Sequence, residues 1–184
     1  GDGVRLEALP EGLYLRNHVW HTAVKDNRDA DPSAGVKIIA WAGRYIVVPL
    51  VNLQMEYPEL KATIYGQYAN DPVEAVLVED KSSGQQILQD LSQPDLGNHR
   101  PALPMVGTAP EFNKLDKLQR ASLEMPQWAA GNVYYLDDGN PLNEAMFEQF
   151  RAFPKGKAKK DLVDAVVHGV HYLRTAALQT GGED

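Results

Sequence analysis

The stretch Phe153-Pro-Lys-Gly-Lys-Ala-Lys-Lys-Asp161-Leu-Val-Asp164-Ala-Val-Val-His-Gly-Val-His-Tyr-Leu173 has more bearing on the fold than any other part of the chain. A loop of Pro, Gly and Lys runs directly into a predicted helix. At about 100° per residue, acids and histidines share one face of that helix and valines share the other. The first set is Asp161, Asp164, His168 and His171, and the second is Val163, Val166, Val167 and Val170. We therefore expect one side to pack on a core and the other to present acids beside a basic loop.

Two acids at the start of a helix also have an ordinary explanation. Asp161 is a natural N-cap, and Asp164 stands three residues later, as in a capping box, where the helix dipole favours both. For this segment alone, capping is the stronger interpretation. A catalytic interpretation needs further carboxylates elsewhere in the chain.

The composition describes an ordinary globular protein. With 184 residues, 43% of them hydrophobic and 23% charged, the chain is long enough for one well-cored domain. We expect a single domain over residues 1–178 and a disordered tail over 179–184. The absence of cysteine excludes disulfides and thiolate metal sites. No apolar run approaches the ~20 residues that span a bilayer, so we expect no membrane partner.

The charge is spread unevenly along the chain. A net charge of −7 argues weakly against nucleic acid as a partner, because DNA-binding proteins usually carry a basic surface. Two local basic groups point the other way, although the ordinary explanation of each is a solvated surface. They are Lys155, Lys157, Lys159 and Lys160, and Lys114, Lys117 and Arg120.

Strand-like segments dominate the first third of the chain, and helices alternate with short strands after it. This order predicts a mixed α/β sheet with helices on its faces. A hairpin is predicted around Ala42-Gly43-Arg44. The predicted strands are 13–24, 36–41, 45–51, 75–78, 102–106 and 133–136, and the predicted helices are 57–68, 83–91, 113–123, 141–150 and 161–178.

Acidic residues follow two of the predicted strands. Glu79 and Asp80 stand at the carboxyl end of an apolar strand, where ligands gather in α/β sheets. A solvent-facing acid, or an acid near the start of the next helix, explains them equally well. The turn after the first strand contains Asp26, Asp29 and Asp31, and an acidic turn is the stronger explanation for any one of these.

Four segments in order make a pattern that is more specific than any one of them. They are Val76-Leu-Val-Glu79-Asp80-Lys-Ser-Ser-Gly84-Gln-Gln-Ile-Leu-Gln-Asp-Leu91, Asp116-Lys117-Leu-Gln-Arg120-Ala, Ala130-Gly-Asn-Val-Tyr-Tyr-Leu136, and Phe150-Arg-Ala-Phe153-Pro154 through Asp161-Leu-Val-Asp164-Ala. Together they resemble the motifs of the nuclease domain of the phage terminase large subunit. The similarity runs from about residue 9 to residue 173.

The resemblance implies an α/β, ribonuclease-H-like fold, with a central mixed β-sheet flanked by helices. It also implies a metal-dependent endonuclease that cuts concatemeric viral DNA during packaging, with Mg²⁺ or Mn²⁺ in a two-metal site. The implied partners are double-stranded DNA, the terminase small subunit, the portal, and an ATPase domain that precedes the nuclease in the full-length family protein. Because that motor is absent from the sequence, the chain resembles an excised nuclease domain of a phage or prophage protein that works in the cytoplasm of the bacterial host.

Carried over residue by residue, the resemblance assigns the site as follows. Glu79, Asp161 and Asp164 match the catalytic, metal-binding acids, and Asp31 matches the acid after the first turn; oxygen ligands of this kind suit hard divalent cations. Basic side chains would hold the DNA backbone without reading its sequence. These are Lys117, Arg120, Lys157, Lys159 and Lys160. For His168 and His171 we expect solvent or packing roles.

The first motif departs from the family pattern. Where the family has an aspartate, this chain has His21, in the run Trp20-His21-Thr22-Ala23, and Lys160 replaces the first of two adjacent acids in the last motif. A neutral imidazole does not carry the charge of a bridging carboxylate. Three outcomes stay open: His21 ligates a metal, a nearby acid such as Asp26 or Asp31 substitutes, or the domain is a catalytically degenerate DNA-binding or assembly module.

Overall fold

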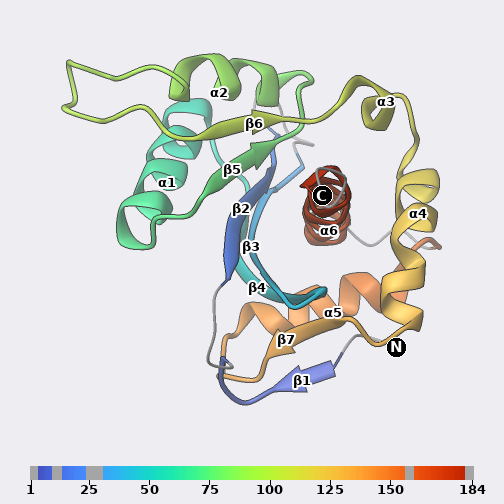
Figure 1. Ribbon diagram of the computed structural model, residues 1–184. Coiled ribbons are helices and arrows are strands. Elements are labelled where there is room, and N and C mark those ends of the chain that lie inside the picture. The colour runs from blue at the N-terminus through green and yellow to red at the C-terminus, as the bar shows by residue number, and fades with distance from the viewer. Residues whose placement is uncertain (1–3, 10–13, 24–30, 156–159, 181–184) are drawn as a thin grey trace.

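A seven-stranded mixed sheet forms the centre of the computed structural model, which describes residues 4–9, 14–23, 31–155 and 160–180 (Figure 1). The strand order is β1-β7-β4-β3-β2-β5-β6. Strands β2, β3 and β4 pair antiparallel, and every other pairing is parallel. The strands are β1 (Val4–Leu6), β2 (Leu15–His21), β3 (Ser33–Trp41), β4 (Arg44–Leu53), β5 (Ala75–Val78), β6 (Met105–Gly107) and β7 (Val133–Leu136). The expected α/β fold with a mixed sheet is confirmed.

Helices cover both faces of the sheet. Figure 1 shows α6 lying in the concave side of the curved sheet, with α4 and α5 on the same side and α1 and α2 on the opposite side. The helices are α1 (Tyr57–Asn70), α2 (Ser83–Leu91), α3 (Pro110–Asn113), α4 (Lys117–Ala129), α5 (Leu142–Ala152) and α6 (Asp161–Thr180). No helix in the described ranges has the length and apolarity needed to cross a membrane.

Alternation along the strands decides which side chains reach which helices. In β2, Val19 lies in the apolar cluster that contains α6, whereas Trp20 lies in the cluster on the opposite face with α1 and α2. In β5, Leu77 faces the α6 cluster. Successive side chains of a strand point to opposite faces, so residues two positions further on share the face of Val19 and Leu77. Those residues are His21 and Glu79, which are thereby directed toward α6.

The valine face of α6 packs against two different groups of elements. Val166 and Val170 pack on the sheet, but Val163 and Val167 pack in a separate cluster with Phe112 and Ala121 of α3 and α4. The face that carries the acids and histidines is largely covered as well, and Asp161 and His168 are buried. The helix is enclosed on nearly all sides because α4 crosses it, a contact that a single-helix pattern does not reveal.

The ends of one predicted helix need correction, and one strand was missed. The predicted helix 113–123 begins too early, because Asp116 caps α4 by accepting from the backbone N–H of Gln119, and the separate short helix α3 ends at Asn113. Pro126 lies inside α4, which continues to Ala129. The strand β1, at the edge of the sheet, has too few residues to give an alternation signal and was not predicted.

Asp161 is not the N-cap of α6. The backbone N–H of Asp164 donates to the carbonyl of Lys160 in the first hydrogen bond of the helix, so Lys160 is the N-cap residue. The backbone N–H of Leu162 is satisfied by the buried side-chain carbonyl of Gln149 in α5, at 2.8 Å. Because Gln149 of α5 accepts from this N–H, the side chain of Asp161 is not needed to cap the helix.

Candidate metal centre

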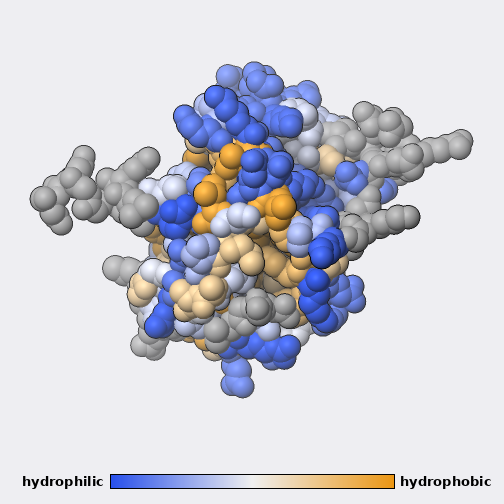
Figure 2. Space-filling view, turned by 90° about the vertical axis from the view of Figure 1, so that its right-hand side faces the viewer, coloured by the Kyte–Doolittle hydropathy of each residue, from blue (hydrophilic) through white to orange (hydrophobic). Residues whose placement is uncertain are grey.

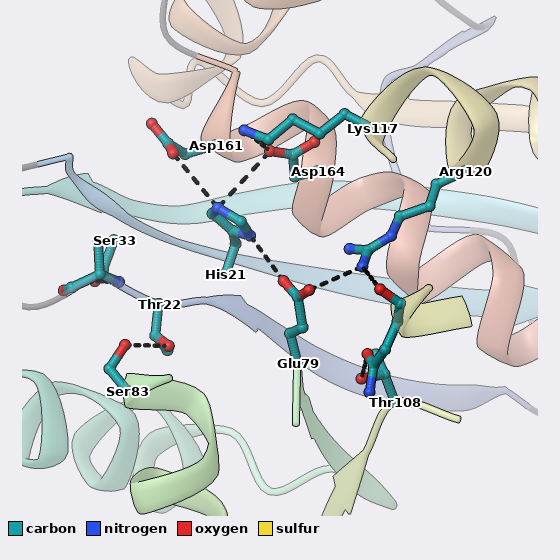
Figure 3. Close-up of polar contacts among 12 residues, drawn as sticks. His21, Thr22, Ser33, Glu79, Ser83, Thr108, Lys117, Arg120, Asp161 and Asp164 are labelled. Atoms are coloured by element: carbon teal, nitrogen blue, oxygen red, sulfur yellow. Dashed lines mark hydrogen bonds and ion pairs between the residues drawn. The ribbon is translucent and has the colours of Figure 1, made fainter. Parts of the chain in front are cut away.

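The carboxyl ends of two parallel strands meet the start of α6 at one edge of the sheet. Trp20 of β2 is paired with Val78 of β5, so the next residues, His21 and Glu79, lie side by side at the ends of these strands. Figure 3 shows both side chains together with Asp161 and Asp164, which come from the first turn of α6. Strand alternation and the pairing register thus bring His21 beside Glu79, and the packing of α6 on the sheet adds Asp161 and Asp164.

His21 lies at the centre of this group (Figure 3). Its Nε2 is 3.6 Å from Oδ1 of Asp161 and 3.7 Å from Oδ2 of Asp164. Its Nδ1 is 3.8 Å from Oε2 of Glu79. One imidazole therefore faces all three carboxylates that the sequence singled out, from the position where the family pattern has an aspartate.

Three of these residues have the spacing of metal ligands. His21, Asp161 and Asp164 each offer a ligand atom, and these atoms all lie within 4.8 Å of one another. Oδ2 of Asp161 is buried and has no hydrogen-bond partner among the described residues. Burial raises the pKa of Asp161; His21 and Lys117 act against this rise, and the negative charges of Asp31 and Asp164 add to it. A bound cation would offset both the cost of burying the charged carboxylate and the repulsion between the acids, so this donor set fits a divalent metal ion.

Glu79 is held by a firmly anchored arginine. Nη2 of Arg120 donates to Oε1 of Glu79 at 2.9 Å. The same guanidinium donates to the backbone carbonyls of Phe112, Leu115 and Asn113. Burial would raise the pKa of Glu79, but the hydrogen bond and charge of Arg120 hold that pKa below 4.5. Glu79 is therefore a carboxylate with one oxygen occupied by Arg120 and the other facing His21.

Asp164 is paired with a second cation, Lys117, at the N-terminus of α4. Nζ of Lys117 lies 2.7 Å from Oδ2 of Asp164. Burial would lower the pKa of Lys117, but the bond with Asp164 outweighs it and the pKa is raised. Glu79, Asp161 and Asp164 carry three negative charges, and Arg120 and Lys117 carry two positive ones, so these five side chains together have one net negative charge.

The group borders a pocket at the surface. Its volume is about 370 Å³. The residues around it come from four parts of the chain: the end of β2, the segment after β5, the start of α4 and the first turn of α6. They are His21, Thr22, Glu79, Lys81, Ser82, Leu115, Asp116, Lys117, Arg120 and Asp164.

The remaining predicted site residues lie at the margin of this group or outside the described residues. Asp31 is exposed, just before β3, and its charge acts on both Asp161 and Lys117. Lys160 donates to the carbonyl of Pro154 and lies over the ring of Phe153. The residues Asp26, Asp29, Lys157 and Lys159 fall outside the described ranges.

A second polar group, which the sequence did not predict, lies behind the first. Glu124 of α4 is wholly buried and accepts two hydrogen bonds from Arg174 of α6, both at 2.8 Å. His171 Nδ1 contacts the same carboxylate at 2.8 Å, and its ring stacks on Phe112. Of the solvent or packing roles expected for His171, the structure shows packing, together with a contact to Glu124 that was not expected. No sequence signal marks Glu124, because its partners are about fifty residues away.

A larger groove on the other side of α4 is apolar. It measures about 810 Å³ and contains none of the predicted site residues. Figure 2 looks onto the side of the molecule with α3 and α4, where hydrophobic residues gather between hydrophilic ones. Leu118, Leu123 and Met125 of α4 are among the exposed large apolar side chains. The chemistry-bearing residues therefore lie in the smaller pocket.

Comparison with known proteins identifies the fold. No family model matches the sequence, and no curated protein matches it. Among solved structures, the P22 large terminase nuclease domain aligns with a TM-score of 0.65 and 13% identity, over 93% of this chain and 88% of that one. The human cytomegalovirus terminase nuclease domain aligns with a TM-score of 0.55 and 15% identity, over 87% of this chain and 84% of that one. The chain has the ribonuclease-H-like fold of terminase nuclease domains.

Proposed function

We propose that the chain is a metal-dependent endonuclease domain of a phage or prophage terminase large subunit, and that it cuts concatemeric double-stranded DNA during genome packaging. The observation that carries this proposal is the convergence of His21, Asp161 and Asp164 within metal-ligand distance, beside Glu79 and at the carboxyl edge of the sheet. The likeness in fold to two terminase nuclease domains supports it.

In this proposal Asp161, Asp164 and His21 hold a divalent ion, with Glu79 as a further carboxylate ligand or base. The ion would supply an activated water and stabilise the leaving oxygen of a phosphodiester. The carboxylates favour Mg²⁺ or Mn²⁺, and a nitrogen ligand at His21 shifts that preference toward Mn²⁺. Arg120 keeps Glu79 ionised and oriented, because its guanidinium is fixed by three backbone carbonyls.

The terminase assignment also implies a substrate, partners and a cellular location. The substrate would be double-stranded DNA, held through its phosphates. The domain would act with an ATPase motor of the same protein, with a terminase small subunit and with a portal, in the cytoplasm of the bacterial host. The support for these partners is the terminase assignment itself.

A second candidate function is a catalytically degenerate DNA-binding or assembly module of the same fold. The observation that favours it is that two of the carboxylates are already paired with cations. Arg120 forms an ion pair with Glu79, Lys117 forms one with Asp164, and the imidazole of His21 lies between the carboxylates. Such a group is close to electrically balanced without any metal. A degenerate site of this kind would keep its fold and lose hydrolysis.

A plasmid-cleavage assay separates the two candidates. We expect the purified domain to nick or linearise supercoiled plasmid in Mn²⁺, with no strong sequence preference. Replacing Glu79 or Asp161 by Ala removes a metal ligand and should slow cleavage by about a hundredfold or more. Glu111→Ala, which removes an exposed acid from α3, is the matched control and should cleave like wild type.

The outcomes of this assay are distinct. Cleavage that survives Asp161→Ala would refute the placement of the site. If wild type is inactive while His21→Asp cleaves, the degenerate module is correct and the fold retains a site that one carboxylate restores. If neither protein cleaves while both bind DNA, the domain is a binding module.

A further inference from the structure

Two cations neutralise carboxylates at this site, and they are held in different ways. The side chain of Arg120 is 14% exposed, packs over the ring of Phe112 and donates to three backbone carbonyls as well as to Glu79. The side chain of Lys117 is 55% exposed, and its ammonium pairs with Asp164. Arg120 is therefore a fixed part of the scaffold, whereas Lys117 is free to move on a flexible stem.

Lys117 pairs with a carboxylate that a metal ion at this site would also bind. Oδ2 of Asp164 lies 2.7 Å from the ammonium of Lys117 and 3.7 Å from Nε2 of His21. Asp164 and His21 also belong to the group with metal-ligand spacing. A divalent ion bound between them would repel the ammonium and compete with it for the same carboxylate. Lys117 and a metal therefore compete for Oδ2 of Asp164.

We infer that Lys117 is an exchangeable counter-ion: it neutralises Asp164 in the metal-free site, and metal binding releases it to bind a DNA phosphate. The released ammonium already lies at the rim of the pocket, next to solvent. This inference rests on the proposed function, because it assumes that the group binds a divalent ion and that DNA is the substrate. In this inference Lys117 is not a constant DNA contact, because it couples the binding of the metal to the binding of DNA.

Coupling of this kind is reciprocal. If a metal frees Lys117 for DNA, then DNA, by holding Lys117 away, must raise the affinity for the metal by the same factor. The metal is thereby bound more tightly when substrate is present. Arg120 does not take part, because its guanidinium stays fixed to the α3–α4 backbone whichever ligand is bound.

The first test measures Mn²⁺ binding to the free protein by the electron paramagnetic resonance signal of unbound Mn²⁺. Lys117→Gln removes the competitor, so we expect its Mn²⁺ affinity to rise by about two- to fivefold, the range of a partly exposed ion pair. Lys114→Gln is the matched control, because it removes one positive charge from an exposed position three residues earlier. The control should bind Mn²⁺ like wild type.

The second test measures the affinity for a short fluorescein-labelled duplex by anisotropy, with and without Ca²⁺ as a non-catalytic hard cation. We expect Ca²⁺ to tighten DNA binding by wild type beyond its effect on Lys117→Gln. Lys114→Gln should lower DNA affinity about equally in the two conditions and keep the Ca²⁺ effect. Circular dichroism of both variants checks that the fold is retained.

An unchanged or weaker Mn²⁺ affinity in Lys117→Gln would overturn the inference, as would a Ca²⁺ effect on DNA binding that survives the substitution. Either result leaves the proposed nuclease function intact, because that function depends on cleavage. If wild type binds no Mn²⁺ at all, the metal centre itself fails, and the proposed function fails with it. If Mn²⁺ binds with the expected coupling but plasmid is not cut, the inference stands and the nuclease function does not.

Discussion

Individual carboxylates in this protein differ in how far they depend on a cation. Glu144 and Arg151 form an exposed pair on α5, with 69% of the Glu144 side chain accessible. Glu79 is half-buried and paired with Arg120. Glu124 is wholly buried and depends on Arg174 and His171 for its hydrogen bonds. Because water screens the first pair and not the last, their contributions to stability must differ.

At this scale we predict the effect of Glu124→Gln. The substitution removes the charge that satisfies Arg174, so the free energy of unfolding should fall by about 1.5–3 kcal/mol. The control, Glu144→Gln, should change it by about 0.5 kcal/mol or less. Urea titrations followed by circular dichroism measure both. Equal small effects in the two variants would show that the buried pair contributes nothing special.

The same pair makes stability depend on pH. Burial would raise the pKa of Glu124, but its hydrogen bonds with Arg174 and His171 hold that pKa below 4.5. A folded-state pKa below the unfolded value gives stability that is present above pH 4.5 and lost as pH falls through the folded value. The difference between wild type and Glu124→Gln should therefore be constant near neutral pH and shrink below pH 4.5. A difference that grows on acidification would contradict this account.

Two elements approach their neighbours so closely that only glycine fits. A Cβ on Gly84, in the first turn of α2, would lie 2.0 Å from the carbonyl oxygen of Glu79. A Cβ on Gly169 of α6 would lie 2.4 Å from Cδ1 of Ile38 and 2.7 Å from Cγ2 of Val19. These glycines set the distance of α2 and α6 from the strands that carry the site. Packing of whole elements, and not only the ligands themselves, therefore positions the carboxylates.

At the scale of elements we predict that Gly169→Ala lowers the free energy of unfolding by about 1–3 kcal/mol, because the added methyl forces α6 away from β2 and β3. Gly66→Ala is the control, since Gly66 lies within α1 and a Cβ there meets nothing within 4 Å. That change should stabilise the protein by about 0.5–1 kcal/mol, through the higher helix propensity of alanine. Urea unfolding measures both, and a neutral Gly169→Ala would show that α6 adjusts freely.

For the molecule as a whole, the proposed metal centre ties together the sheet and its covering helix. A ligand that binds only the folded state stabilises it by RT ln(1 + [L]/Kd), about 2.7 kcal/mol at a hundredfold excess over Kd. We predict that saturating Mn²⁺ raises Tm by about 5–10 °C. Differential scanning calorimetry measures this rise. Asp161→Asn should lose most of it, and an equal rise in that variant would place the metal elsewhere.

Several features of the molecule could be predicted from the sequence because they depend on neighbours in the chain. Alternation and turn residues predicted the hairpin of β3 and β4, and the short apolar run at 75–78 predicted β5 with Glu79 after it. The ends of α4 were predicted less well: the helix begins after its cap at Asp116 and continues past Pro126 to Ala129. Periodicity covers a few residues at a time, so element types are well predicted and their ends are not.

By itself, the sequence determined the mixed α/β order, the strand-end acid Glu79 and the paired acids of the last helix, since local backbone preferences and side-chain periods are enough for these. Only the tertiary structure decided that His21 faces all three carboxylates, that Arg120 is anchored on Glu79 and that α6 is enclosed on nearly every side. Arg120 and Glu79 are 41 residues apart, and contacts of that kind depend on strand register and helix packing. Such contacts leave no local pattern in the chain, because each half is an ordinary charged residue until the fold brings the two together.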